Sequence, residues 1–311
     1  MLRLILILAF VGNSLSARAQ DFATIFSEFL SAKRVLSSEV IAASRNYQYV
    51  FVSGFLSEQT PLYWSDNEDS LTELGIPHDR ITILHPSSAQ TTLQNSVWLA
   101  EQLLNITSQQ PIILLAHSKG AVETVLFAAH NIEFVKRRIK AIFLIQGAFG
   151  GSAIADALYA KDLSLDSRMP SLLRITLKLD YYIRLFLMRN FMDGLKSLTT
   201  DYAKQLWSQQ DERIRRLKGV LDNKLFFITS SQAPERMSHF LKSSGYYLSI
   251  YFGGENDGLL FPEDQSLALV GKKIAHLNAD HADLTVSSPV SRRKGGYRFA
   301  FVQSLLTWLL D

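Results

Sequence analysis

The stretch Pro111-Ile-Ile-Leu-Leu-Ala-His-Ser118-Lys-Gly120 indicates the fold class. A run of large apolar residues ends at Ala-His-Ser-Lys-Gly, and the helix-forming segment Ala-Val-Glu-Thr-Val-Leu-Phe-Ala-Ala begins directly after it. This order predicts a buried strand, a sharp turn that carries a serine, and a helix, which is the pattern of a nucleophile elbow. Such a turn needs small residues two before and two after the serine, and Ala116 and Gly120 meet that need. A serine that only caps the helix would look similar, so later residues must decide.

Two later segments supply an acid and a base in the required chain order. The aromatic run Tyr246–Phe252 is predicted to be a strand, and Asp257 lies in the glycine-rich turn that follows it. The segment Lys272–Leu277 is predicted to be a last short strand, and His281 lies in its exit loop. His281 is expected to take the proton of Ser118, while Asp257 fixes the imidazole tautomer and stabilises the imidazolium.

Other residues compete for two of these roles. His117, next to the serine, is expected to point away from it and to be structural, and His276 is expected to pack within the last strand. For the acid, Asp264 and Asp280 are the rivals of Asp257. Asp264 is expected in a following helix, and Asp280 adjoins the base in sequence, so neither is well placed to orient the imidazole.

Four segments in order resemble the α/β-hydrolases of the bacterial lipase and esterase kind. The stretch Val50–Phe55 resembles their oxyanion strand and loop, and Ala116–Gly120 resembles their elbow in an alanine variant. Gln146–Asp156 is similar to the loop after the next strand. Asn256–Leu259 and Asp280–Leu284 resemble the acid and histidine loops. The resemblance spans roughly residues 47–290, and it implies a serine hydrolase with an acyl-enzyme intermediate.

The resemblance also implies an oxyanion hole made by the backbone N–H groups of Phe55 and Lys119. The family usually has histidine just before the oxyanion-loop glycine, where this chain has Ser53, so the loop must be supported by different hydrogen bonds. Some lipases bind calcium through an aspartate like Asp283, helped by a glutamine at the position of Ser287. Because one aspartate is not a calcium site, no metal and no cofactor are expected.

Strands and helices are predicted to alternate along the chain, which favours an α/β fold with a mostly parallel sheet flanked by helices. Besides the strands and the helix above, helices are predicted at Asp21–Ser44, Ser70–Leu74, Thr91–Asn105 and Tyr297–Leu310, and strands at Tyr47–Val52, Arg80–Leu84, Ile139–Ile145 and Lys224–Ile228. One hydrolase domain over residues 20–311 is therefore expected.

A long insertion, Lys161–Val220, lies between the fourth and fifth of these strands, and a helical cap is predicted over about residues 157–222. Its segment Leu172–Met192 is apolar almost all round, and the insertion holds twelve Lys and Arg residues against seven Asp and Glu. Such a cap can shape an acyl pocket and rest on anionic lipid. The alternative is that its apolar residues pack on the core and its basic residues are solvated.

The N-terminus and the composition favour an exported enzyme. Arg3, a short apolar run and the small-x-small site Ala17-Arg-Ala19 predict a cleaved signal peptide over residues 1–19 and a secreted or periplasmic protein. The formal charge of +3 falls to +1 without Arg3 and Arg18, which predicts no nucleic-acid binding. The absence of cysteine leaves no disulfide and no thiol chemistry.

The predicted function is hydrolysis of carboxylic esters with an apolar acyl part by Ser118, Asp257 and His281, as in a lipase or esterase. A polyester depolymerase, a thioesterase or an amidase with the same triad is the alternative among enzymes. A relative that binds lipid or a partner without turnover is the alternative from another class, since fold does not fix function. The expected partner is a small-molecule or lipid ester, with a lipid surface against the cap.

Overall fold

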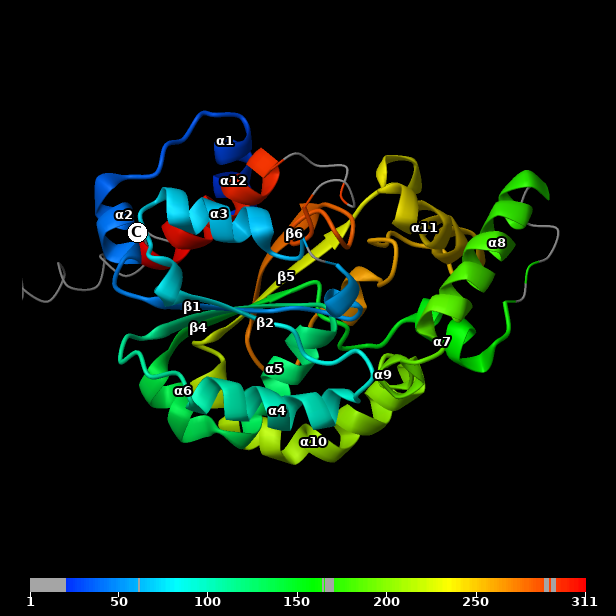
Figure 1. Cartoon of the computed structure of the whole chain (residues 1–311), viewed down its shortest axis with the longest axis horizontal. Helices are drawn as coiled ribbons and strands as arrows, with labels where there is room; N and C mark the ends of the chain where they lie inside the picture. The colour runs from blue at the N-terminus through cyan, green and yellow to red at the C-terminus, as the bar shows by residue number, and fades with distance from the viewer. Residues whose placement is uncertain (1–20, 61, 164, 166–170, 288–290, 292–294) are drawn as a thin grey trace, which may run out of the picture.

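The protein is described by a computed structural model, which covers residues 21–60, 62–163, 165, 171–287, 291 and 295–311. The predicted signal peptide lies outside these residues. One sheet of six parallel strands forms the centre, in the order β2-β1-β3-β4-β5-β6 (Figure 1). The strands are β1 (Gln48–Val52), β2 (Ile81–Leu84), β3 (Ile112–His117), β4 (Ile139–Ile145), β5 (Leu225–Ser231) and β6 (Lys272–Asn278). The predicted α/β fold with a parallel sheet is confirmed.

Helices cover both faces of the sheet, because its central strands are apolar on both sides. In β1, Val50 and Val52 face one core cluster, while Tyr49 and Phe51 face the other. The first cluster is covered by α4 (Thr92–Leu104), α5 (Lys119–His130), α6 (Ile132–Arg138) and α10 (Thr200–Leu221). The second is covered by α1 (Phe22–Leu30), α2 (Ser38–Ser44), α3 (Ser65–Glu73) and α12 (Gly295–Leu310).

The predicted strand Tyr246–Phe252 is wrong: this segment belongs to the helix α11 (His239–Tyr251). Its buried positions are Leu241, Ser244, Gly245, Tyr247 and Leu248, which is the spacing of one helix face. The aromatic residues that suggested a strand lie partly on that face and partly in solvent-accessible positions. The segment Asp21–Ser44 likewise forms two helices, α1 and α2, instead of one.

The insertion between β4 and β5 is helical. It comprises α7 (Ala153–Ala160), α8 (Ser171–Met188), α9 (Met192–Lys196) and α10. Helix α10 returns to the body and packs on α5, whereas α8 packs on α7 and α11, beyond the carboxyl ends of the strands (Figure 1). No helix among the described residues combines the length and the apolar character that crossing a membrane requires. Short 3₁₀ helices complete the chain: η1 (Ser57–Gln59), η2 (His78–Arg80), η3 (Pro234–Arg236) and η4 (Pro262–Gln265).

Helix α8 has a buried inner face and, opposite it, an outer face of exposed apolar residues. Leu177, Tyr181, Arg184 and Met188 recur at helical spacing and are buried against α7 and α11. On the outer face, six apolar side chains are between 46% and 66% exposed: Ile175, Leu179, Tyr182, Ile183, Phe186 and Leu187. The outer face therefore does not pack on the core.

Candidate active site

The turn between β3 and α5 places Ser118 at the carboxyl edge of the sheet. Ser118 has φ 55° and ψ −123°, a backbone conformation that L-residues rarely adopt. Helix α5 begins so close to the end of β1 that a Cβ on Gly120 would lie 2.4 Å from the backbone oxygen of Ser53. Only glycine fits there, as the sequence pattern predicts.

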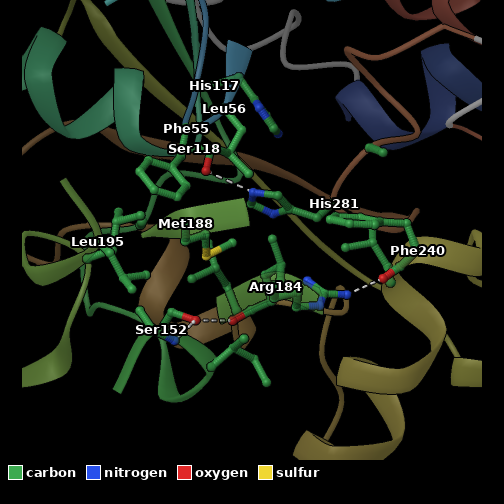
Figure 2. A pocket seen from close by; sticks show the side chains of 18 of the residues that line it. Phe55, Leu56, His117, Ser118, Ser152, Arg184, Met188, Leu195, Phe240 and His281 are labelled. Carbon is green, nitrogen blue, oxygen red and sulfur yellow. Dashed lines mark hydrogen bonds between the residues drawn. The ribbon is translucent and has the colours of Figure 1, made fainter. Parts of the chain in front are cut away.

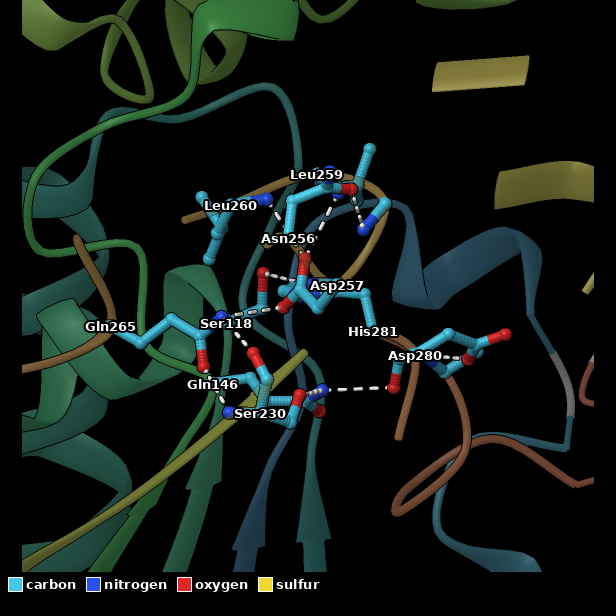
Figure 3. Close-up of polar contacts among 12 residues, drawn as sticks. Ser118, Gln146, Ser230, Asn256, Asp257, Leu259, Leu260, Gln265, Asp280 and His281 are labelled. Atoms are coloured by element: carbon cyan, nitrogen blue, oxygen red, sulfur yellow. Dashed lines mark hydrogen bonds and ion pairs between the residues drawn. The ribbon is translucent and has the colours of Figure 1, made fainter. Parts of the chain in front are cut away.

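The structure brings the three predicted residues into one hydrogen-bonded chain (Figure 3). The Nε2 atom of His281 lies 2.9 Å from Oγ of Ser118, and its Nδ1 atom lies 2.7 Å from Oδ2 of Asp257. Ser118 and His281 are 8% and 6% exposed, and Asp257 is fully buried. Ser118 follows β3 and His281 follows β6, and both lie at this edge because parallel strands end together. Asp257 follows helix α11 and returns to the same edge, where the backbone oxygen of its neighbour Asn256 accepts from N–H of Gln232 at 2.8 Å.

Four donors surround the carboxylate of Asp257. Its Oδ1 accepts from N–H of Leu259 and of Leu260, at 2.9 and 2.8 Å, and its Oδ2 accepts from Nε2 of Gln265 at 3.1 Å and from His281. An ionised carboxylate only accepts hydrogen bonds, so the proton of neutral His281 lies on Nδ1. Its Nε2 lone pair therefore faces the hydroxyl of Ser118. Gln265 was not among the residues predicted from the sequence.

The two rival carboxylates, Asp280 and Asp264, have other surroundings. Asp280 accepts hydrogen bonds from N–H of Ser238, Ala282 and Asp283. Burial, with the nearby Asp283 carboxylate, raises the pKa of Asp280 to about 6. Burial also raises the pKa of Asp264 to about 6, helped by nearby carboxylates. Within the described residues, neither carboxylate is hydrogen-bonded to His281.

His117 does not bond to Ser118, but its ring packs 4.7 Å from the ring of His281. The hydroxyl of Tyr63 accepts from N–H of Gly54 at 3.0 Å. It donates its own proton to Nδ1 of His117, because Oε1 of Gln146 can only accept and the single proton of the neutral ring is therefore on Nε2. Nε2 of His117 then donates to Oε1 of Gln146 at 3.1 Å. Burial and the nearby His281 hold the pKa of His117 well below its usual range, so the ring is neutral.

Gln146 continues this chain of hydrogen bonds to the loop that carries His281. Its Nε2 donates to the backbone oxygen of Asp280 at 2.9 Å and to the hydroxyl of Ser230 (Figure 3). Tyr63, His117 and Gln146 thus connect Gly54 with the residue that precedes His281. The other histidine considered, His276, lies between the hydroxyls of Thr229 and Ser231 and takes no part.

The loop after β1 has its own supports at Ser53, the position where the lipases that the sequence resembles usually have histidine. The hydroxyl of Ser53 pairs with Nδ1 of His85 at 3.1 Å, and N–H of Leu56 donates to Oγ of Ser88 at 2.7 Å. Among the described residues, N–H of Phe55 and N–H of Lys119 have no hydrogen-bond acceptor. The Lys119 side chain turns away into a buried ion pair with Glu123, 2.5 Å from Nζ to Oε1.

A cavity of about 170 Å³ opens beside Ser118 and His281 (Figure 2). Its wall is mostly apolar and comes largely from the insertion and from α11: Leu158, Met188, Leu195, Leu198, Phe240 and Leu241. Apart from the two histidines and Ser118, three polar side chains of the lining have hydrogen-bond partners within the protein. Thr60 donates to the backbone oxygen of Leu56, Ser152 donates to the backbone oxygen of Leu259, and Tyr63 donates to His117. Arg184 is the cation of this wall.

The described part of the chain groups no three His, Asp or Glu side chains as a metal site would require. At the two positions compared with calcium-binding lipases, Oδ1 of Asp283 accepts from Oγ of Ser291 at 2.8 Å, and Ser287 pairs with Ser65.

No family model and no curated protein matches this sequence. Among solved structures, a metagenomic carboxyl esterase is similar with a TM-score of 0.61 at 17% identity, over 88% of this chain and 76% of that one. The mature lipase of Bacillus licheniformis gives 0.52 at 18% identity, over 75% and 84%. Its propeptide form gives 0.55 at 19% identity, over 85% of this chain and 50% of that one. With the six parallel strands and their two helical layers, these similarities show that the chain has the α/β-hydrolase fold.

Proposed function

We propose that this protein is a serine hydrolase that cleaves carboxylic esters with an apolar acyl part. The observation that carries the proposal is the hydrogen-bonded chain from Ser118 through His281 to Asp257, which opens on an apolar cavity. The fold it shares with a carboxyl esterase and a lipase agrees with this chemistry, although fold alone does not fix function.

In the proposed reaction, His281 Nε2 takes the proton of Ser118 as its oxygen attacks the ester carbonyl. The imidazolium that forms is stabilised by the buried carboxylate of Asp257. His281 then gives the proton to the leaving alcohol, and an acyl group remains on Ser118. In the second half, His281 activates a water molecule that releases the acid.

The backbone N–H groups of Phe55 and Lys119 form the proposed oxyanion hole. Neither has an acceptor among the described residues, whereas N–H of Gly54 and of Leu56 is bonded on either side of Phe55. A Cβ on Gly54 would lie 2.8 Å from Cβ of Ser118, so this loop lies directly against the nucleophile. Donors fixed before the reaction stabilise the developing charge without reorganisation.

The test is a panel of p-nitrophenyl esters of increasing chain length, run beside a fluorophosphonate probe. The wild-type protein should be labelled and should turn over esters, and Ser118→Ala should abolish both, with a loss in kcat on the order of 10⁶. His281→Ala should be nearly as damaging, whereas His276→Ala should not. Labelling without ester turnover points to thioesters or amides. A wild-type protein that is not labelled contradicts the proposal and favours a binding protein.

We further propose that the insertion, about residues 157–222, forms a cap over the site and that the outer face of α8 rests on anionic lipid. The exposed apolar residues of this face are flanked by the exposed cations Lys178 and Arg189. The guanidinium of Arg189 lies 4.3 Å from the ring centre of Phe186, so the charge is next to the apolar surface. A surface that is apolar and basic suits a membrane of anionic lipid.

A further inference from the structure

Arg184 is a buried cation in the wall of the cavity. It comes from the inner face of α8 and is 3% exposed. Its Nε donates to Oδ2 of Asp180 at 2.8 Å, its Nη2 donates to the backbone oxygen of Phe240, and its guanidinium lies 4.2 Å from the centre of the Phe240 ring. Figure 2 shows Arg184 across the cavity from Ser118.

These contacts leave much of the guanidinium unused. It has five N–H donors, and two of them have the acceptors just named. Among the described residues, no other acceptor is bonded to Arg184. Its countercharge, Asp180, has a side chain that is 26% exposed and is therefore partly hydrated, while the Arg184 side chain is 4% exposed. The mostly apolar wall of the cavity thus includes a buried guanidinium whose counterion is partly hydrated. A second anion at this site would compensate further for the cost of burying the cation.

We infer that Arg184 binds an anionic oxygen group of the substrate, a carboxylate or a phosphate. The inference rests on the proposed function, because it places this group on an ester whose carbonyl is attacked by Ser118. The apolar lining between the two residues then holds an apolar segment, so the substrate is an ester with an anionic group at the far end of its acyl chain. A guanidinium matches the geometry of both anions and bonds them strongly in a poorly hydrated site.

A purely structural role makes a different prediction. If Arg184 only fastens α8 to α11 through Phe240, its loss disturbs the cavity for every ester alike. If it binds the substrate, its loss affects the esters that carry a negative charge. Substrates of one length that differ only in that charge therefore separate the two roles.

The experiment compares p-nitrophenyl half-esters of dicarboxylic acids, from glutarate to sebacate, with the same compounds capped as methyl esters. In the wild-type protein, the free acid should be preferred by about 10- to 100-fold in kcat/KM at one chain length, as expected for hydrogen bonds to a charged group. Arg184→Met should remove this preference, so that the free acid and the capped ester have equal kcat/KM. A matched compound with a terminal phosphate shows which anion is bound better.

Asp180→Asn is the matched variant, because it removes the countercharge and keeps the guanidinium. Its preference for the free acid should exceed that of the wild-type protein, whereas a structural role predicts equal losses on both substrates. The inference is overturned if the wild-type protein shows no preference at any length, a comparison that needs no variant. Labelling by fluorophosphonate and turnover of capped esters report on the proposed function separately. If these persist without a preference, only the inference about Arg184 fails.

Discussion

At the scale of single residues, the four hydrogen bonds to Asp257 predict what happens when its charge is removed. Asp257→Asn keeps the shape of the side chain, but an NH₂ group in place of Oδ2 opposes the donors of both Gln265 and His281. The imidazole then favours the wrong tautomer, and kcat should fall by roughly 10⁴, measured on a soluble p-nitrophenyl ester. Asp280→Asn is the control and should cost far less activity. An inactive Asp280→Asn beside an active Asp257→Asn would transfer the role.

The hydroxyl of Tyr63 offers a second test, because it supports the proposed oxyanion loop at Gly54 and the ring of His117 together. Tyr63→Phe leaves N–H of Gly54 without its buried acceptor and should lower kcat by about tenfold, since Phe55 loses its fixed position. Tyr49→Phe also deletes a buried hydroxyl, bonded to the backbone oxygen of Ser44 and remote from the cavity. Both variants should lose similar stability in denaturant. Equal activities would show that Tyr63 is only structural.

At this scale, the sequence predicts Ser118, Asp257 and His281 because their order and their loop positions are constrained by the fold. It does not predict Gln146, Gln265 or Tyr63 as parts of the site, because glutamine and tyrosine occur throughout the chain with no diagnostic spacing. Their importance comes from distant contacts: Gln265 bonds Ser230 and Asp257, while Gln146 bonds His117 and Asp280.

At the scale of elements, the sequence predicts the buried strands well because each is a compact apolar run between helices. The error at Tyr246–Phe252 has a physical cause: aromatic residues favour strands on average, but α11 buries only one of its faces. The course of α8 beyond the sheet likewise depends on contacts with α7 and α11 that no local pattern contains.

The outer face of α8 can be tested by the pair Phe186→Ser and Leu187→Ser, which removes exposed apolar area without touching the core. Activity on an emulsified long-chain ester should fall much more than activity on a short soluble ester. Added salt should weaken the part of the attraction that comes from the basic residues. Leu93→Ser with Val97→Ser, on the exposed face of α4, is the control and should affect neither substrate. Equal losses of the α8 variant on both substrates would contradict lipid contact.

At the scale of the whole molecule, stability should depend on the charge of Asp264, which lies near the site without being hydrogen-bonded to His281. Burial and nearby carboxylates raise its pKa from 3.8 to about 6 in the folded protein. The stability that comes with the protonated form is therefore full below pH 3.8 and is lost as the pH rises through about 6. Asp264→Asn should raise the free energy of unfolding at pH 8, and the gain should disappear toward pH 4. Chemical denaturation at both values measures it, and kcat should stay unchanged. A gain of equal size at both values would exclude the charge as its source.

The backbone of Ser118 has a consequence for how such a chain evolves. Its φ of 55° is a conformation that glycine adopts freely and serine does not, at a cost on the order of 1–3 kcal/mol. Selection for thermal resistance alone would therefore favour glycine at position 118 over serine or alanine. A mutational library screened only for survival on heating would accumulate glycine at position 118 and so lose the proposed nucleophile. With Ser118 as the proposed nucleophile, heat tolerance and turnover make opposite demands on this one backbone angle. Only a selection that also requires turnover would then retain the serine.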